Sequence, residues 1–431
     1  MAIIERTLFL LIILIIGWLI PKVLRLKISR WERIGLSPFL GFGLISTLYF
    51  FICFNLKLSI GVWPLISIIL VILAFPHVKV QYSAFRFEWS LIRFILVSVS
   101  ALAILYCTLQ SVYWPVWSPD AVFLYDFRAK LLIHVGNFNY LSLKLPTSLG
   151  YPPFTTMVHY LSYKTGWQSA TWFYPLTFLG FWLVTAGWVT RHTRSQFRGL
   201  LTATLIVITP SILWNSFLGL TNILYTQLLT LCFFYLIDAT SGRSNIFFGL
   251  LSGFLLGLSV FTRMEAFWII PIVLLIMAGM VKRSFIPLGL FLAAFIPLSM
   301  LWPNYTNSVY AQFPNGQVTT EIQSLYSHVF HPELIPILKF MILPLASSWG
   351  FLPVLVLALF VWEAVKHRRI RLPMIISLSL SLAVFLGFIN FAVRNPSWTS
   401  LSSSLYRMAT LAVPFFWVAI VTSSYWDKRK L

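Results

Sequence analysis

Apolar segments of about 20 residues recur along this chain, and they limit its fold more than any other feature. A bilayer core about 30 Å thick is crossed by roughly 20 helical residues. Charged residues make up 10% of the chain and hydrophobic residues 59%, whereas about 25% charge is typical of soluble domains. Since lipid offers no hydrogen bonds to the backbone, the segments are predicted to be helices. The expected fold class is an all-α polytopic membrane protein.

The pattern predicts about thirteen transmembrane helices. They cover about residues 6–21, 36–55, 58–76, 91–110, 168–190, 200–216, 222–238, 245–262, 266–281, 285–301, 348–366, 373–391 and 405–424. Most of the Lys and Arg residues fall in one set of connections, which the positive-inside rule assigns to the cytoplasm. The long connections 111–167 and 302–347 are then outer loops. The first apolar segment lacks a small-residue cleavage site after it, so we expect a retained helix rather than a removed signal.

The formal net charge of +20 does not indicate a nucleic-acid partner, because the bases lie in short patches between apolar spans. Cys53, Cys107 and Cys232 are isolated in such spans, which predicts buried hydrophobic side chains rather than disulfides. The chain has no phosphate-binding glycine loop, dinucleotide fingerprint or H-E-x-x-H motif. His328 and His331 are spaced for a shared metal ion, but no further ligand is evident, so no metal site is expected.

Residues 117–130 concentrate charge in a chain that has only eleven acids. Asp120 and Asp126 stand there with Arg128 and Lys130, among aromatic residues. A carboxylate at a membrane surface can act as a general base when a hydroxyl lies within hydrogen-bond reach. The simpler interpretations are that Asp120 caps a helix starting at Ala121 and that Asp126 pairs with Lys130 four residues on. For Asp126 we favour the pairing.

Other polar residues lie at the outer ends of the spans. Arg407 opens the last span with Ser404 on the same helical face, and it either snorkels or binds a phosphate. Arg263 and Glu265 form a short outer link, where charges need partners or a wet cavity. Asn222 lies at another outer end. The segment 151–163 is predicted to be a helix at the outer interface, and 335–345 a similar surface or re-entrant segment.

Four segments together resemble one enzyme family. Residues 120–130 match D-A-x3-[WY]-x2-K-A-K with Arg128 in place of the first lysine, and residues 151–154 match the Y-P-x-L or P-P-L start of a surface helix. Residues 257–265 are similar to G-L-A-x-L-T-K-x-E, and 404–407 to S-L-D-R. These motifs occur in this order in bacterial GT-C glycosyltransferases related to aminoarabinose transferases and protein O-mannosyltransferases, the family 39-like enzymes.

The resemblance implies a GT-C-type bundle with outward-facing juxtamembrane helices in the first large outer loop. Residues 91–431 would form the catalytic module and 1–90 an N-terminal addition of transmembrane helices. It also implies inverting transfer of a sugar from a polyprenyl-phosphate donor to a lipid, glycan or protein acceptor at the outer face of the plasma (inner) membrane. No cofactor is implied, and a divalent-metal requirement stays open.

The resemblance assigns roles to residues. Asp120 would be the general base, with Asp126 as the second candidate catalytic acid. The candidate donor-phosphate ligands are Arg407, Arg263, Lys130 and Arg128, and the other candidate site residues are Glu265, Ser404, Tyr151 and Asn222. The family commonly has an aspartate where this chain has Asn222, so a base at that position is not expected.

Two other functions fit a polytopic chain of this kind. A transporter or flippase of lipid-linked sugars would place ionisable groups near the bilayer midplane, whereas the acids here gather at outer span ends. An O-antigen polymerase or ligase would depend more on Arg394, His328 and His331.

Overall fold

The computed structural model describes residues 2–74, 90–114, 116, 118–136, 151–240, 246–270, 272–273, 276, 285–312, 334–368, 371–394 and 402–423. Within them every regular element is helical. The elements are α1 (Ala2–Val23), α2 (Arg30–Phe50), η1 (Phe51–Asn55), α3 (Val62–Ala74), α4 (Leu91–Tyr113), α5 (Pro119–Ala121), η2 (Val122–Asp126), α6 (Phe127–Val135), α8 (Phe154–Lys164), α9 (Phe173–Thr193), α10 (Gln196–Ile208), α11 (Pro210–Asn215), α12 (Thr221–Thr240), α13 (Phe247–Thr262), η4 (Met264–Ile269), α15 (Ile286–Gln312), α17 (Leu334–Trp349), α18 (Leu352–His367), α19 (Leu372–Arg394), α20 (Ser402–Ala409) and α21 (Val413–Val421).

Seven helices in the described part are long and apolar enough to cross a membrane, so the chain is a multi-pass membrane protein. They are Ile4–Val23, Arg30–Asn55, Leu91–Tyr113, Phe173–Thr193, Thr221–Thr240, Ile286–Val309 and Leu372–Ile389. The helices α17 and α18 meet at 81° and make an eighth if they form one broken span. Every expected span except 266–281, half of which lies outside the described residues, coincides with one helix or with two consecutive helices. The count of thirteen crossings stays a prediction.

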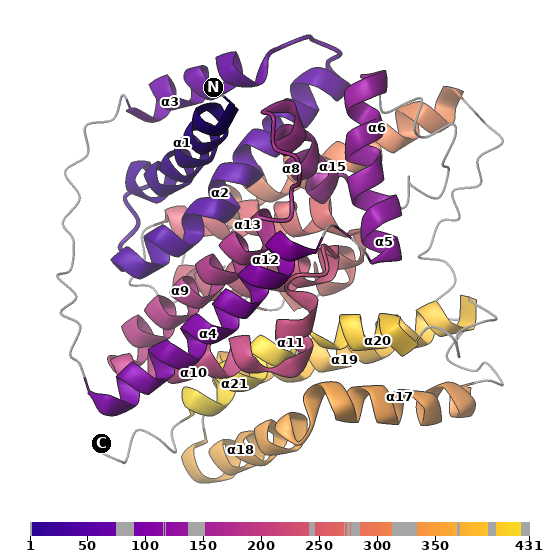
Figure 1. The fold of residues 1–431 in the computed structure, drawn as a ribbon. Coiled ribbons are helices and arrows are strands. Elements are labelled where there is room, and N and C mark those ends of the chain that lie inside the picture. The colour runs from indigo at the N-terminus through magenta and orange to yellow at the C-terminus, as the bar shows by residue number, and fades with distance from the viewer. Residues whose placement is uncertain are drawn as a thin grey trace.

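Burial separates the central helices from the peripheral ones. The most apolar stretch of α2 is 72% buried, that of α9 78% and that of α12 89%, against 17% for α4 and 22% for α15. The central three helices therefore pack against protein on most sides, and α4 and α15 expose most of their apolar surface to lipid. Figure 1 shows the segment from α17 to α21 gathered along one side of the molecule. Because α2 lies in the centre, part of the segment 1–90 belongs to the core of the bundle.

A row of glycines on α13 lets that helix touch α15. A Cβ atom at Gly249 would lie 2.1 Å from the carbonyl oxygen of Pro287, and one at Gly253 would lie 2.2 Å from that of Phe291. Gly257 meets the side chain of Leu298 in the same way. Small residues four apart allow close backbone contact between helices in lipid, where apolar burial does not drive association.

Two segments that carry candidate site residues differ from expectation. The helix of Asp120 begins at Pro119, with Ser118 as the residue before it, and no side-chain cap is formed. The predicted capping role of Asp120 is therefore wrong, because proline is favoured in the first helical position and starts the helix one residue earlier. The segment 151–163 does contain a helix, α8, but residues 154–162 are all buried within the protein rather than exposed at an interface.

Candidate functional site

Asp120 and Arg407 form an ion pair although 287 residues separate them in the chain. The Nη1 atom of Arg407 lies 2.5 Å from Oδ2 of Asp120. The Asp120 side chain is 48% exposed and that of Arg407 19%. The pair joins α5 to α20. The two residues, which sequence analysis proposed separately, therefore lie at one site.

A second ion pair belongs to the same site. Arg263 contacts Glu265 through Nη2, at 2.5 Å from Oε1, and its Nη1 donates to Oδ1 of Asn222 at 2.8 Å. The Tyr151 hydroxyl lies within electrostatic reach of both ion pairs: burial raises the pKa of Tyr151, the arginines lower it, and Glu265 and Asp120 raise it. We call the five residues Asp120, Arg407, Arg263, Glu265 and Tyr151 the Tyr151 cluster.

Arg128 holds the backbone of Tyr151 in place. Its Nη1 donates to the carbonyl oxygens of Tyr151, at 3.0 Å, and Leu124, at 3.2 Å. Its guanidinium lies 5.7 Å from the centre of the Trp302 ring. Arg128 is buried, and burial lowers its pKa to about 10. These contacts give Arg128 a positioning role, although the sequence suggested it as a phosphate ligand.

Asp126 is buried and surrounded by hydrogen-bond donors. It pairs with Lys130 at 2.8 Å, as predicted, and it also accepts from Nδ1 of His159 at 3.1 Å and from the Tyr163 hydroxyl. Burial opposes ionisation, but the bonds from His159, Lys130 and Tyr163 outweigh it and hold the pKa of Asp126 well below its usual range. Asp126 is thus a fixed carboxylate in a buried network.

The network continues through residues that the sequence did not single out. Nε2 of His159 lies 2.7 Å from the Tyr174 hydroxyl, which donates to the carbonyl oxygen of Gly219 at 3.1 Å. We call Asp126, His159, Tyr174 and the Gly219 carbonyl the His159 network. His159 stands between Val158 and Tyr160 in the sequence, and only a histidine between apolar and aromatic residues could have indicated it.

Tyr125 connects the two groups of residues. Its hydroxyl lies 2.9 Å from Oγ1 of Thr221, which also accepts a 3.4 Å bond from Arg263. Burial raises the pKa of Tyr125 to about 12, which keeps the phenol protonated. The Tyr151 cluster and the His159 network therefore form one polar region, built from the segment between α5 and α9, the first residues of α12, the link from α13 to η4, and α20.

Some proposed residues have no described side chain. The backbone of Ser404 lies in α20, three residues before Arg407, but its side chain is outside the described part. His328, His331 and the side chain of Arg394 are outside it as well. Within the part of the chain that is described, no group of three His, Cys, Asp or Glu residues is placed to hold a metal ion.

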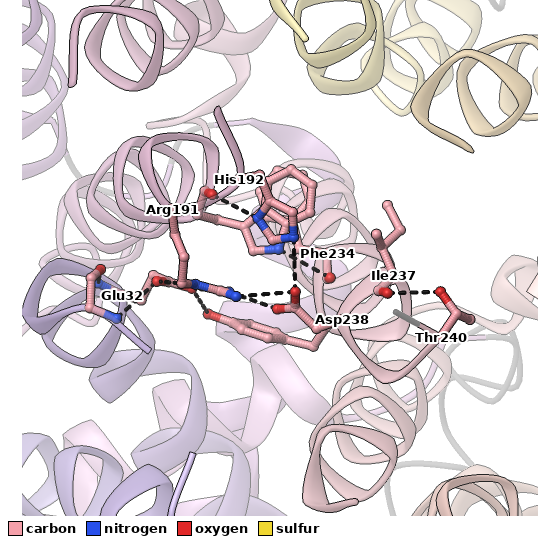
Figure 2. A network of polar contacts seen from close by, with 10 residues as sticks. Glu32, Arg191, His192, Phe234, Ile237, Asp238 and Thr240 are labelled. Carbon is pink, nitrogen blue, oxygen red and sulfur yellow. Dashed lines mark hydrogen bonds and ion pairs between the residues drawn. The ribbon is translucent and has the colours of Figure 1, made fainter. Parts of the chain in front are cut away.

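A further polar network lies at the opposite end of α9 and α12 (Figure 2). Nη2 of Arg191 lies 2.8 Å from Oε2 of Glu32 and 2.7 Å from Oδ2 of Asp238. Nε2 of His192 lies 2.9 Å from Oδ1 of Asp238, and its Nδ1 faces the Trp188 carbonyl oxygen. We call Glu32, Arg191, His192 and Asp238 the Glu32 network. The signal that could have indicated it is the scarcity of acids in the chain, since both carboxylates stand near the ends of apolar segments.

The two ends of the bundle are about one hydrocarbon thickness apart. Along α9 the polar ends are marked by Tyr174 and Arg191, and along α12 by Asn222 and Asp238. At 1.5 Å per residue, each pair of residues is about 25 Å apart. The apolar middle of both helices therefore fits between two polar ends, as expected for membrane crossings.

The Tyr151 cluster can bind an anion beside a carboxylate. Two guanidinium groups come from different elements, and each offers N–H donors in the fork geometry that suits phosphate. Asp120 is half exposed and can accept a proton from a hydroxyl that reaches it. Comparisons of the chain with protein-family models, curated proteins and solved structures find no match.

Proposed function

We propose that this protein is a membrane glycosyltransferase that moves a sugar from a polyprenyl-phosphate donor to an acceptor hydroxyl at the outer face of the plasma membrane. The observation that carries the proposal is the ion pair of Asp120 with Arg407, together with a second arginine, Arg263, whose charge acts on the same Tyr151 hydroxyl. A carboxylate base next to two fixed positive charges suits a reaction in which a hydroxyl loses a proton and a phosphate leaves.

In the proposed reaction Asp120 accepts the proton of the acceptor hydroxyl while its oxygen attacks the anomeric carbon. The bond from that carbon to the phosphate oxygen breaks on the opposite face, which inverts the configuration. Arg407 and Arg263 stabilise the charge that develops on the leaving lipid phosphate. Both arginines are paired with carboxylates in this structure, so the donor phosphate replaces or joins those pairs. Lys130, Ser404 and Asn222 are further candidates for contacts to the donor.

The finer features of the fold belong to the same proposal: a GT-C-type bundle of about thirteen crossings, with a catalytic module at 91–431. The basic links support its orientation. Arg25 and Lys27 connect α1 to α2, and Arg194 and Arg198 flank the start of α10, all at the end that holds the Glu32 network. By the positive-inside rule that end is cytoplasmic, which puts the Tyr151 cluster outside.

Replacement of Asp120 tests the proposal. Purified protein in vesicles receives radiolabelled polyprenyl-phosphate sugars and an envelope extract, and transfer is counted. We expect Asp120→Asn to lower kcat by at least about 100-fold, because general-base catalysis contributes about that much. Glu5→Gln is the control, since the hydrogen bond of Glu5 goes to Trp63 of α3 and not to a residue of the cluster. Transfer at a normal rate by Asp120→Asn would remove Asp120 from the mechanism.

One observation favours a second candidate function, a carrier of lipid-linked sugars. Polar networks that contain ionisable side chains lie at both ends of α9 and α12, an arrangement that could open alternately on the two sides of a membrane. Vesicles that contain the protein and a fluorescent lipid-linked sugar, but no acceptor, distinguish the classes: a carrier moves the lipid between leaflets and a transferase does not.

A polymerase or ligase would depend on Arg394, His328 and His331.

A further inference from the structure

His159 is a completely buried histidine whose ring nitrogens both have polar partners. Nδ1 faces the Asp126 carboxylate and Nε2 faces the Tyr174 hydroxyl. Tyr174 gives its single hydroxyl proton to the carbonyl oxygen of Gly219, which can only accept. Nδ1 bonds the Asp126 carboxylate, and Nε2 and the Tyr174 hydroxyl bond each other. The result is a chain of bonds from η2 through α8 and α9 to the link before α12.

This chain of bonds returns to the residue next to Asp120. Gly219 has a φ of +73°, and a Cβ atom there would lie 3.4 Å from Cβ of Ala121. The Gly219 link leads directly to Thr221 and Asn222, which bond Arg263. The His159 network therefore holds two segments in place. One is the end of η2, at Asp126, and the other is the backbone at Gly219, which lies between Ala121 and the residues that bond Arg263.

The conformation of η2 makes such a fixing point necessary. Val122–Asp126 is a π-helical turn, which is less stable than an α-helical turn and holds one additional residue. Without the bonds at Asp126 the segment can relax to an α-helix. A shift by one residue turns the preceding residues by about 100° around the helix axis, since an α-helix has 3.6 residues per turn. Asp120 would then face away from Arg407.

We propose that His159 is a positioning residue: through Asp126 and Tyr174 it holds η2 in its π-helical form and thereby sets Asp120 beside Arg407. The effect of His159 on the reaction rate rests on the proposed function. Its effect on the distance between Asp120 and Arg407 does not, and the two effects are tested separately.

The first test is kinetic. His159→Gln is expected to lower kcat about 100-fold, the effect of a misplacement of about 1 Å, with the donor KM unchanged within about twofold. Tyr174→Phe, a milder change that breaks the bond to Gly219, should lower kcat in the same direction. Ser162→Ala is the control, because it removes a buried hydroxyl from the same helix that bonds only the Val158 carbonyl oxygen. A normal kcat in both folded variants, His159→Gln and Tyr174→Phe, overturns the proposal.

The second test needs no substrate. Cysteines replace Asp120 and Arg407 in a protein whose Cys53, Cys107 and Cys232 are changed to alanine, and a short bifunctional thiol reagent cross-links them. Adding His159→Gln should reduce the cross-link yield several-fold, whereas Ser162→Ala should not. An unchanged yield overturns the proposal. If no donor supports transfer but the yield falls, the proposed function fails while the positioning role of His159 stands.

Discussion

At the scale of single residues, the carboxylates around the site lie where a basic side chain meets them. Asp120 pairs with Arg407, Asp126 with Lys130 and Glu265 with Arg263. A buried carboxylate without such a partner would lose its hydration without compensation. The three pairs differ in what surrounds them: Asp126 is enclosed by donors, whereas Asp120 and Glu265 are about half exposed. Asp120 and Glu265 are therefore accessible from outside the protein, whereas Asp126 serves stability.

Replacing Asp126 should change how stability depends on pH. The folded-state pKa of Asp126 lies below its unfolded value of about 3.8, so the carboxylate stabilises the fold above that pH and the stabilisation is lost as pH falls toward the folded pKa. We expect Asp126→Asn to lower the free energy of unfolding by about 3 kcal/mol near pH 7. The difference should be constant from pH 7 to 5 and shrink below pH 4, as followed by denaturant unfolding in detergent.

The control for that measurement is Lys130→Gln. Lys130 is 55% exposed, so its loss should cost less than about 1 kcal/mol. A stability difference between the wild type and Asp126→Asn that stayed the same down to pH 3 would show that ionisation of Asp126 is not what stabilises the network.

At the scale of the helices, the sequence predicted where most helices lie along the chain, but not which other helices pack around them. The apolar runs predicted the helices that carry the spans, because length and hydropathy decide them. The environment of each helix depends on residues far away in the chain. Helix α8 looked like an interfacial helix, yet α2, α6 and α13 cover it. His159 and Tyr174 are 15 residues apart, and nothing in their local sequence says that they bond each other.

The contact between α13 and α15 gives a prediction at this scale. Gly253→Ala places a methyl group against the Phe291 carbonyl oxygen, and a backbone atom cannot move aside cheaply. We expect a Tm several degrees lower, since overpacking typically costs 1–3 kcal/mol. Gly289→Ala on α15 is the matched control: nothing lies within 4 Å of its added Cβ, so it should leave Tm unchanged or raise it. Equal melting temperatures for the two variants, measured in one detergent, would contradict close packing at Gly253.

At the scale of the whole molecule, polar networks lie at both ends of α9 and α12, with an apolar stretch between them. The sequence predicted polar residues at one of these ends, because charge is concentrated at 117–130. It did not predict the Glu32 network, whose residues come from three separate segments. The pairing of Asp120 with Arg407 also lay beyond any local pattern, since it depends on how the C-terminal helices pack on the rest.

Membrane orientation can be measured at these two ends. Lys164 and Arg194 are both exposed. Lys164 is the last residue of α8, before α9 begins, and Arg194 follows the other end of α9. In a cysteine-free background, Lys164→Cys should react with a membrane-impermeant thiol reagent in intact spheroplasts. Arg194→Cys should react only after the membrane is permeabilised. The reverse labelling pattern would place the Tyr151 cluster in the cytoplasm and exclude the proposed donor arrangement.

The ion pair between Asp120 and Arg407 also has a consequence for synthesis. A ribosome that adds about 5–20 residues per second makes Arg407 about 15–60 s after Asp120, since 287 residues separate them. For all that time the helix of Asp120 waits in or near the membrane without its partner. Nascent and prematurely terminated chains that lack α20 thus cannot form this ion pair, however many of their helices have already been inserted.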